Sequence, residues 1–364
     1  MNKHVLIAFV ILMFAGCRSS KVELPMAKRP LNVIFVVGDG MGLSQVTAGM
    51  YANDNEIELE RCPVIGLIKT HASDDLITDS AAGATAFACG KKTYLGAIGV
   101  TKDTLACRNI FEMAKNRKMN TGLVVTSEIV HATPAAFFAH EPFRLSYENI
   151  AKDFMKSDMD LAVGGGLRYF RDRRDKKNLL PKLQDKGYYV RNWQTEFRKL
   201  NVPAEQKLLY FTDIDKPARK EKGRDYLPAA TEFSMNFLNE RSKAGFMLLV
   251  EGSQIDWGGH ANDKDYVLTE MLDFNATLKK ILDFAEEDGH TLVVITADHE
   301  TGGLAIKRGS TTEDLNIKFS SGGHTGTMVP VFAYGPGSER FAGIYDNTEI
   351  FQKLREALGW KKGS

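Results

Sequence analysis

The sequence has almost no net charge and no long apolar run in its body. Its 364 residues include 47 Lys and Arg against 46 Asp and Glu, which leaves a formal net charge of +1. A chain without a basic excess has no electrostatic basis for binding nucleic acid. No stretch after residue 30 approaches the roughly 18 apolar residues that a membrane-spanning helix needs. The chain after residue 30 therefore has the composition of an ordinary globular protein, and only the N-terminal region has a pattern that could attach the protein to a membrane.

Cysteine is also scarce. The chain has four cysteines, and three of them, Cys62, Cys89 and Cys107, follow the N-terminal region. An odd number gives no disulfide framework, although one pair can form, and the spacing matches no CxxC metal site. Cys89 lies in an alanine-rich run, which favours a small buried residue there. The sequence also lacks a GxGxxG or GK[ST] nucleotide loop, an internal repeat and a low-complexity tract.

The N-terminus has the pattern of an export signal. A lysine precedes an apolar run over residues 5–15, and small residues then lead to Cys17. We expect residues 1–16 to be a lipoprotein-type signal peptide with lipid attached to Cys17, and residues 17–30 to be a polar tether. Phe14 departs from the leucine usual in that signal, so an ordinary cleaved signal is the alternative. Either signal predicts an exported protein, periplasmic or anchored by lipid to the outer membrane.

Strand-like apolar runs alternate with helical patterns along residues 31–364. The strand-like runs cover residues 32–37, 122–126, 161–163, 246–250, 291–296 and 330–334. The segments with apolar residues at i, i+3 and i+4 cover residues 105–119, 147–155, 229–241, 266–287 and 348–358. This alternation predicts one α/β domain with a large, mostly parallel central sheet sandwiched between helices. A charge-dense segment at about residues 168–226 is expected to be a solvated, peripheral part of it.

Several strand-like runs end in residue types that bind metals, and the carboxyl ends of parallel strands are where functional groups gather. The first run ends in GDGMG, which places Asp39 between glycines; a nucleotide loop is the alternative, without its usual motif. Glu251 ends another run and is followed by Asp256 and His260. Their i, i+4 spacing puts two ligands on one face of a helical turn. A polar loop with a structural histidine is the alternative.

Two further candidate groups lie near the last strands. Asp298 and His299 follow the run at 291–296, and His324 lies in a glycine loop before the last run. Asp and His together fit zinc or a similar ion. Seven candidate ligands then gather at four strand ends: Asp39, Glu251, Asp256, His260, Asp298, His299 and His324. That number exceeds the needs of one ion, and neighbouring divalent ions about 4 Å apart form the clamp used in phosphoryl transfer.

The segment TDSAAGATA supplies a candidate nucleophile, Ser80. Small residues after Ser80 favour a helix, with Asp79 or Ser80 as its N-cap. A serine at a helix N-terminus lies in a positive field with free N–H groups nearby, which suits a phosphate. A plain capping serine is the alternative that this segment alone leaves open.

Taken together, these segments make the sequence resemble the alkaline phosphatases. The motifs that carry the resemblance follow the family's order over residues 36–337: VGDGMG, TDSAAGATA, HATPAAFFAH with Arg144, VEGSQIDWGGH, TADHETGG and HTG…AYGPG. The resemblance implies the alkaline phosphatase fold, with a small or absent crown insertion because residues 300–323 are few. It implies hydrolysis of small phosphate monoesters through a phosphoserine on Ser80, with inorganic phosphate as product. It also implies a homodimer.

The resemblance implies three metal sites and a phosphate-binding residue. The first Zn²⁺ is expected on Asp256, His260 and His324. The second Zn²⁺ is expected on Asp39, Ser80, Asp298 and His299. A Mg²⁺ is expected on Asp39, Thr133 and Glu251, with Asp39 bridging two sites. Arg144 is expected to bind the phosphate, because its planar guanidinium can hold two oxygens at once.

Two positions near the third metal divide the family. His131 stands where one well-known bacterial branch has Asp, and Trp257 stands where that branch has Lys. This difference leaves both Mg²⁺ and Zn²⁺ open as the third ion. The histidines outside the motifs are expected to be structural: His4, His71, His140 and His290.

Two other classes of function remain as alternatives. A phosphodiesterase or a sulfatase shares this scaffold, but Ser80 lies in DSAAG rather than in a CxPSR-like motif, and Arg144 leaves no room for a second ester group. A non-catalytic lipoprotein that binds metal or phosphate would have lost the nucleophile or a ligand, and none is lost.

Overall fold

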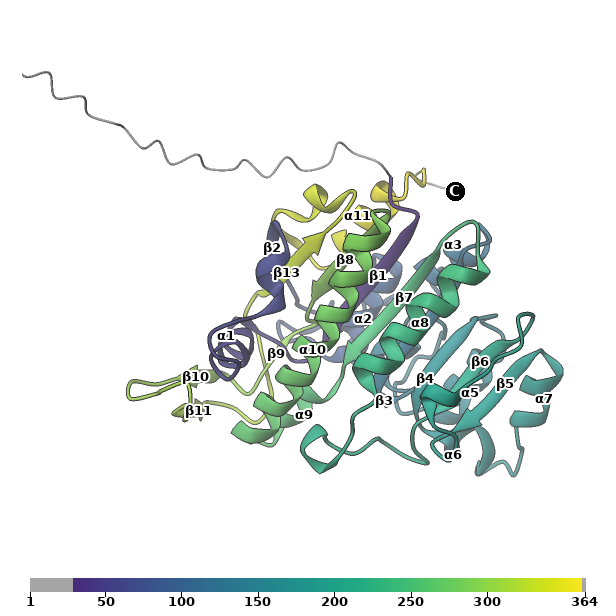
Figure 1. Ribbon diagram of the computed structural model, residues 1–364, viewed down its shortest axis with the longest axis horizontal. Helices are drawn as coiled ribbons and strands as arrows, with labels where there is room; N and C mark the ends of the chain where they lie inside the picture. Colours follow the sequence, from purple (N-terminus) through teal and green to yellow (C-terminus); the bar gives the residue numbers. More distant parts are fainter. Residues whose placement is uncertain (1–28, 362–364) are drawn as a thin grey trace, which may run out of the picture.

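The computed structural model describes residues 29–361 of the chain. The expected signal peptide, Cys17 and nearly all of the expected tether lie outside these residues. The described chain is built on a ten-stranded sheet of order β14-β2-β13-β8-β1-β7-β3-β4-β6-β5 (Figure 1). Neighbouring strands from β8 to β5 are all parallel, whereas β13 is antiparallel to both of its neighbours. The predicted large, mostly parallel sheet is thus confirmed.

The elements have the following bounds. The strands of the large sheet are β1 (Asn32–Gly38), β2 (Val64–Lys69), β3 (Asn120–Glu128), β4 (Leu161–Gly165), β5 (Tyr188–Asn192), β6 (Lys207–Phe211), β7 (Phe246–Gly252), β8 (Thr291–Thr296), β13 (Val329–Tyr334) and β14 (Gly343–Asp346). Two small antiparallel pairs join β10 (Leu304–Ile306) to β11 (Ile317–Phe319) and β9 (Glu300–Thr301) to β12 (His324–Thr325). The helices are α1 (Leu43–Tyr51), α2 (Ser80–Cys89), α3 (Ile110–Lys115), α4 (Ala132–Ala135), α5 (Tyr147–Phe154), α6 (Leu167–Arg171), α7 (Leu180–Asp185), α8 (Leu227–Arg241), α9 (Gln254–His260), α10 (Lys264–Asp288) and α11 (Glu349–Ala357).

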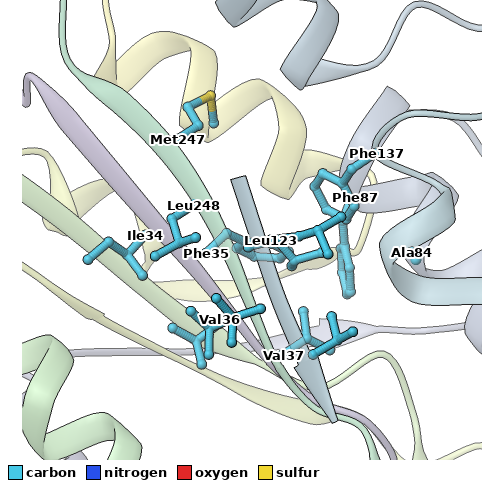
Figure 2. Close-up of a cluster of buried hydrophobic side chains, with 14 of the residues drawn as sticks. Ile34, Phe35, Val36, Val37, Ala84, Phe87, Leu123, Phe137, Met247 and Leu248 are labelled. Atoms are coloured by element: carbon cyan, nitrogen blue, oxygen red, sulfur yellow. The ribbon is translucent and has the colours of Figure 1, made fainter. Parts of the chain in front are cut away.

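Helices cover both faces of the sheet. In Figure 1 the long helices α8 and α10 lie in front of it, and α2 and α3 lie behind it. Every residue of β1 is buried, as expected for a central strand with helices on each side. Phe35 of β1 packs against Phe87 of α2 and against Phe137, with ring centroids 5.4 Å and 6.0 Å apart (Figure 2). These contacts hold α2 against the sheet.

Helix α2 is buried along its whole length. All ten of its residues are buried, and most are Ala, Gly or Ser. Small side chains let a helix approach a sheet closely, which explains why a segment without amphipathic character forms a core helix here. The Asp79 side chain caps its N-terminus by accepting a hydrogen bond from the Ala82 N–H, and Gly90 ends it in a left-handed conformation with φ +66°.

The expected elements are found, with one correction. All six strand-like runs fall within strands, and four of the five helical segments coincide with helices α5, α8, α10 and α11. The helix expected over 105–119 is wrong at both ends, because α3 begins at Ile110 and ends at Lys115. Asn109 starts it through a capping box with Glu112, and Lys118 has φ +61°, which a continuing helix excludes.

The sequence analysis missed four strands of the large sheet. Strands β2 and β14 lie at one edge, and β5 and β6 lie at the other. The charge-dense segment at about 168–226 carries β5 and β6, so it extends the sheet at its periphery. Within residues 29–361, no helix is both long enough and apolar enough to cross a membrane.

Candidate active site

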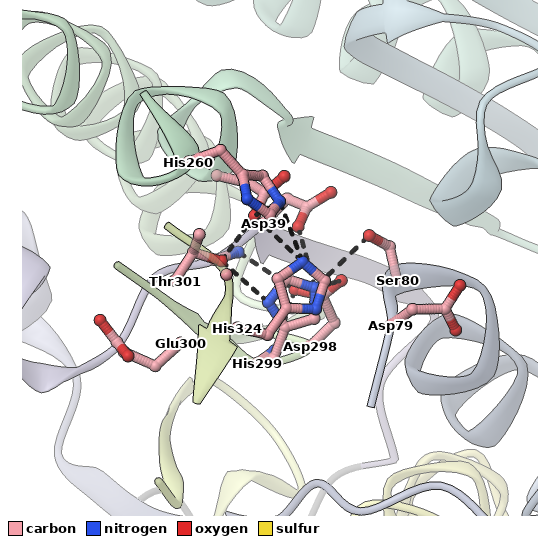
Figure 3. A network of polar contacts seen from close by, with 12 residues as sticks. Asp39, Asp79, Ser80, His260, Asp298, His299, Glu300, Thr301 and His324 are labelled. Atoms are coloured by element: carbon pink, nitrogen blue, oxygen red, sulfur yellow. Dashed lines mark hydrogen bonds and ion pairs between the residues drawn. The ribbon is translucent and has the colours of Figure 1, made fainter. Parts of the chain in front are cut away.

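Side chains that follow the central strands β1, β7 and β8 meet those of the β9–β12 pair beyond the carboxyl ends of these strands (Figure 3). Asp39 follows β1 and is fully buried, and neither of its carboxylate oxygens has a hydrogen-bond partner among the described residues. Gly40 has φ +73°, and a Cβ there would lie 2.7 Å from the Cα of Asp256. Only glycine lets the β1 turn approach the α9 turn this closely, and that approach brings the two aspartates together.

The His260 and His324 imidazoles face the same point as Asp256. The Nδ1 of His260 lies 2.8 Å from the Gly322 carbonyl, and the Nδ1 of His324 lies 2.8 Å from the Thr78 carbonyl. A carbonyl only accepts, so each Nδ1 carries the proton and each Nε2 presents a lone pair. The two Nε2 atoms are 3.1 Å apart, and they lie 3.4 Å and 3.6 Å from Asp256 Oδ1. Three electron-pair donors this close repel each other unless a cation lies between them.

A second ligand group surrounds His299. Its Nε2 lies 3.2 Å from Asp298 Oδ2 and 3.5 Å from Asp39 Oδ1. Asp39, Asp256 and His299 can also offer one atom each within 4.8 Å of one another. The Ser80 hydroxyl lies 3.4 Å from the same Nε2 (Figure 3). The candidate nucleophile therefore lies beside the candidate second metal site.

The third ligand group joins His131 to Asp39 and Glu251, and both carboxylates are fully buried. Ser127 and Ser253 donate to one oxygen of Glu251, at 3.2 Å and 2.5 Å, and its other oxygen has no partner among the described residues. Burial raises the pKa of Glu251 to about 7. Burial, with Arg144 nearby, lowers the pKa of His131 to about 3, so this imidazole is neutral and available as a ligand.

Thr133 and Trp257 flank this third group. Thr133 is fully buried in α4, two residues after His131, and its hydroxyl is one of the groups that oppose the rise in the pKa of Glu251. The His131 and Trp257 rings meet edge to face, with centroids 5.9 Å apart and an interplanar angle of 81°. The indole therefore fixes the orientation of the imidazole.

The three groups fit divalent cations. Burial, Asp298, Asp256 and Glu251 raise the pKa of Asp39 well above its usual range. Such a cluster of buried carboxylates is costly unless positive charge neutralises it. The mixture of imidazole and carboxylate ligands suits Zn²⁺ at the first two groups, and the oxygen-rich third group suits Mg²⁺ as well.

Arg144 and Ser80 are linked through Asp79. Asp79 accepts hydrogen bonds from the N–H groups of Ala82 at 3.0 Å and Gly96 at 3.1 Å, and from Arg144 Nη1 at 2.7 Å. Burial alone would raise the pKa of Asp79, but Arg144 and these N–H groups lower it below its usual value. Asp79 is thus the N-cap and Ser80 the first residue of α2. One carboxylate orders both the helix of the candidate nucleophile and the candidate phosphate-binding side chain.

Sequence analysis did not find Thr301, which joins two of the ligand groups. The buried Thr301 hydroxyl donates to Asp256 Oδ1 at 2.5 Å and lies 3.2 Å from His299 Nδ1. Its place in the motif TADHETGG, two residues after His299, was the sequence feature that could have identified it. Glu300, beside it, accepts hydrogen bonds from Gln45 Nε2 at 2.7 Å and from the Thr325 hydroxyl. These contacts tie the β9–β12 pair to α1.

Comparison with known proteins agrees with this geometry. The family model described as alkaline phosphatase matches residues 30–316 and 308–360. The chain is 35% identical to alkaline phosphatase 3 of Bacillus subtilis, over 90% of this chain and 88% of that protein. It is 30% identical to the alkaline phosphatase of Escherichia coli, over 95% and 90% of the two chains.

A solved structure is also similar. The alkaline phosphatase of the Antarctic bacterium TAB5 superposes with a TM-score of 0.87 and 43% identity, covering 92% of this chain and all of that one. Two variants of that protein, in which a histidine is replaced by Glu or Asp, hold magnesium in its M3 site. The chain belongs to the alkaline phosphatase family, and it is a phosphomonoester hydrolase.

Proposed function

We propose that the protein hydrolyses phosphate monoesters through a phosphoserine on Ser80, with two zinc ions and a third metal ion bound beside it. The observation that carries this proposal is the position of Ser80. Its hydroxyl lies at the N-terminus of α2 and 3.4 Å from His299 Nε2, next to three groups of buried ligand atoms. A capping serine alone would not need these groups.

In this proposal the first zinc is held by Asp256, His260 and His324. The second is held by Asp39, Ser80, Asp298 and His299. The third ion is held by Asp39, Thr133 and Glu251, with His131 and Trp257 beside it. Asp39 and Asp256 each belong to two of the three ligand groups, as expected where neighbouring ions share carboxylate ligands.

The protein's own residues then perform the following steps. The Ser80 oxygen attacks phosphorus, the bond to the leaving alcohol breaks, and the alcohol departs as phosphoserine forms. Water next attacks that phosphorus from the side that the alcohol left, opposite Ser80, which releases inorganic phosphate and restores the Ser80 hydroxyl. Bound metal ions supply Lewis acidity, which lowers the pKa of the attacking hydroxyl and stabilises the charge on the leaving oxygen.

Arg144 binds the equatorial oxygens of the phosphoryl group. Asp79 holds one of its guanidinium nitrogens and leaves the rest of the planar fork free for phosphate. The N–H groups at the start of α2 add positive field at the same place. Together they stabilise a transition state whose charge is spread over three oxygens.

The deciding experiment measures turnover of an aryl phosphate, an aryl phosphodiester and an aryl sulfate at alkaline pH with Zn²⁺ and Mg²⁺ present. We expect monoester turnover that chelation abolishes and that Ser80→Ala lowers by several orders of magnitude. Ser234→Ala is the matched control, because Ser234 is also buried and its hydroxyl donates a hydrogen bond to the Ala230 carbonyl of its own helix, away from the ligand groups. Faster turnover of the diester or the sulfate than of the monoester would overturn the proposal.

Isolation of the covalent intermediate tests the serine directly. Rapid acid quenching with labelled substrate should trap phosphate on the tryptic peptide that contains Ser80, and the Ser80→Ala protein should trap none. Label on another residue would disprove the role of Ser80 while leaving the hydrolase assignment intact.

We further propose that the protein is exported, with residues 1–16 as a signal peptide, and that it acts as a homodimer in the periplasm or at the outer membrane. Incorporation of labelled fatty acid that disappears in Cys17→Ala would support the lipid anchor, and its persistence would exclude Cys17 as the site. Sedimentation equilibrium on the protein that starts after Cys17 would distinguish dimer from monomer.

A further inference from the structure

Two of the three body cysteines lie together at the far end of helix α2. Cys89 is the last residue of α2, whose first residue is Ser80. Its thiol donates a hydrogen bond to the Cys107 carbonyl at 3.2 Å. Both residues are buried. Cys62, by contrast, sits elsewhere in the hydrophobic core, where burial raises the pKa of its thiol to about 12.

The two thiols are not equivalent. Cys107 lines a surface pocket of about 600 Å³ that also includes Arg108, Glu112 and His140. Cys89 is not among the residues that line this pocket. A reagent that enters the pocket therefore meets the sulfur of Cys107 first.

The side of the pocket next to Cys107 favours its ionised form. His140 contacts the Gly99 carbonyl through Nδ1 at 2.7 Å and Glu112 through Nε2 at 3.0 Å. This contact with Glu112 raises the pKa of His140 to about 9, so the imidazole is a cation at neutral pH. The thiol of Cys89 and the charge of His140 lower the pKa of Cys107, whereas Cys107 and burial raise the pKa of Cys89. An acidic thiol that lines a pocket, next to a neutral thiol, is the arrangement of an attacking and a resolving cysteine.

We propose that Cys89 and Cys107 form a disulfide bond, which ties the C-terminal end of the helix that carries Ser80 to the segment before α3. The oxidant is a small or protein disulfide. The Cys107 thiolate attacks one of its sulfurs and releases the other as a thiol. Cys89 then loses its proton and attacks the Cys107 sulfur of the mixed disulfide, releasing the second thiol. The oxidant's disulfide is reduced to two thiols, and one protein disulfide is formed.

The bond has a structural consequence for α2. The segment from residue 89 to 107 becomes a closed loop, which lowers the entropy of the unfolded chain. In the folded state the segment is already held by a hydrogen bond from Cys107 N–H to the Gly99 carbonyl and by the bridge between Val100 and Ala106. Because little rearrangement is needed there, we expect a stabler protein with an unchanged active-site end of α2.

The test uses the metal-loaded, full-length chain with Cys17→Ser, so that only the three body thiols react. The protein is incubated with oxidised or reduced glutathione, denatured and alkylated. We expect three alkylated thiols after reduction and one after oxidation, and a peptide that links residues 89 and 107 by mass spectrometry. We also expect the melting temperature to rise by roughly 3–6 °C on oxidation, with unchanged kcat.

Single-cysteine variants distinguish this disulfide from other reactions of the thiols. Cys62→Ala should still show the loss of two thiols and the rise in melting temperature, whereas Cys107→Ser and Cys89→Ala should show neither. Three reactive thiols after oxidation, a lasting glutathione adduct on Cys107, or a crosslink to Cys62 would each overturn the proposal. Because these readouts are thiol counts and melting temperatures, the outcome is independent of whether Ser80 is the nucleophile.

Discussion

Replacing Thr301 by valine should weaken zinc binding although Thr301 is not a ligand. Thr301 accepts from His299 Nδ1 at 3.2 Å and donates to Asp256 Oδ1 at 2.5 Å. The chain of hydrogen bonds therefore runs from His299 through the hydroxyl to Asp256. It fixes the histidine tautomer that presents Nε2 to the metal, and it orients a carboxylate that two ligand groups share.

The size of the effect follows from what valine removes. Valine keeps the shape of threonine in a fully buried position but leaves Asp256 Oδ1 without that donor and His299 Nδ1 without that acceptor. A hydrogen bond to a charged group contributes about 1.5–3 kcal/mol. That range corresponds to roughly 10–100-fold in metal affinity, the same range found when a group that orients a metal ligand is removed.

The assay is a titration of activity against free zinc, set by a competing chelator. Thr301→Val should shift the midpoint upward by that factor, while kcat at saturating zinc changes less. Thr301→Ser keeps the hydroxyl and should stay within a few-fold of the parent. Thr231→Val is the matched control, because Thr231 is equally buried and its hydroxyl has no partner among the described residues. Equal zinc midpoints for Thr301→Val and Thr301→Ser would refute the reasoning.

Three further predictions concern Arg144, the third metal and the Glu112–His140 ion pair. Arg144→Lys keeps the charge but loses the planar fork, so kcat/KM should fall by about 10²-fold and the inhibition constant for phosphate should rise; an unchanged inhibition constant would remove Arg144 from the phosphate site. His131→Asp, with or without Trp257→Lys, adds a carboxylate to an oxygen-rich group, so activity should respond to Mg²⁺ at about tenfold lower concentration, and an unchanged magnesium titration would count against that role. In Glu112→Gln the capping of α3 is kept but the His140 cation loses its partner. The pKa of His140 is about 9 in the fold and about 6.5 unfolded, so the stabilisation is complete below pH 6.5 and is lost as pH rises through 9. The stability gap between parent and variant, roughly 1–2 kcal/mol at pH 6 after allowance for partial exposure, should therefore close by pH 10 in chemical denaturation; a gap that is constant with pH would contradict it.

The sequence could predict the parts of the site that lie close together in the chain. Asp256 and His260 are four residues apart, and the helical turn expected for them is α9. Asp39 could be identified because it ends a strand between glycines, and Ser80 because small residues follow it. In each case a local pattern, strand end or helix start, fixes which way the side chain faces.

Features made by distant segments could not be predicted in the same way. Gln45 and Glu300 are 255 residues apart in the chain, and their contact exists only because β9 folds back over α1. Strands β5 (YYVRN) and β6 (KLLYF) were missed because each has only a short apolar stretch, which lies within the charge-dense segment. The proximity of Cys89 to Cys107 likewise depends on how the end of α2 packs against the segment that precedes α3.

The electrostatics of the site explain why its ligands could be recognised and why they need metal. Asp39, Glu251 and Asp298 are fully buried and Asp256 nearly so. Arg144 acts to lower the pKa of Asp39, but burial and the neighbouring carboxyl groups outweigh its effect. The same burial that raises the pKa of Asp39 makes its ionised form costly without a cation. Bound divalent ions stabilise only the folded state, by about 4 kcal/mol at a thousand times the dissociation constant. The carboxylates that we propose as metal ligands therefore cost folding energy when no metal is bound, and this cost would couple the stability of the fold to the chemistry proposed at Ser80.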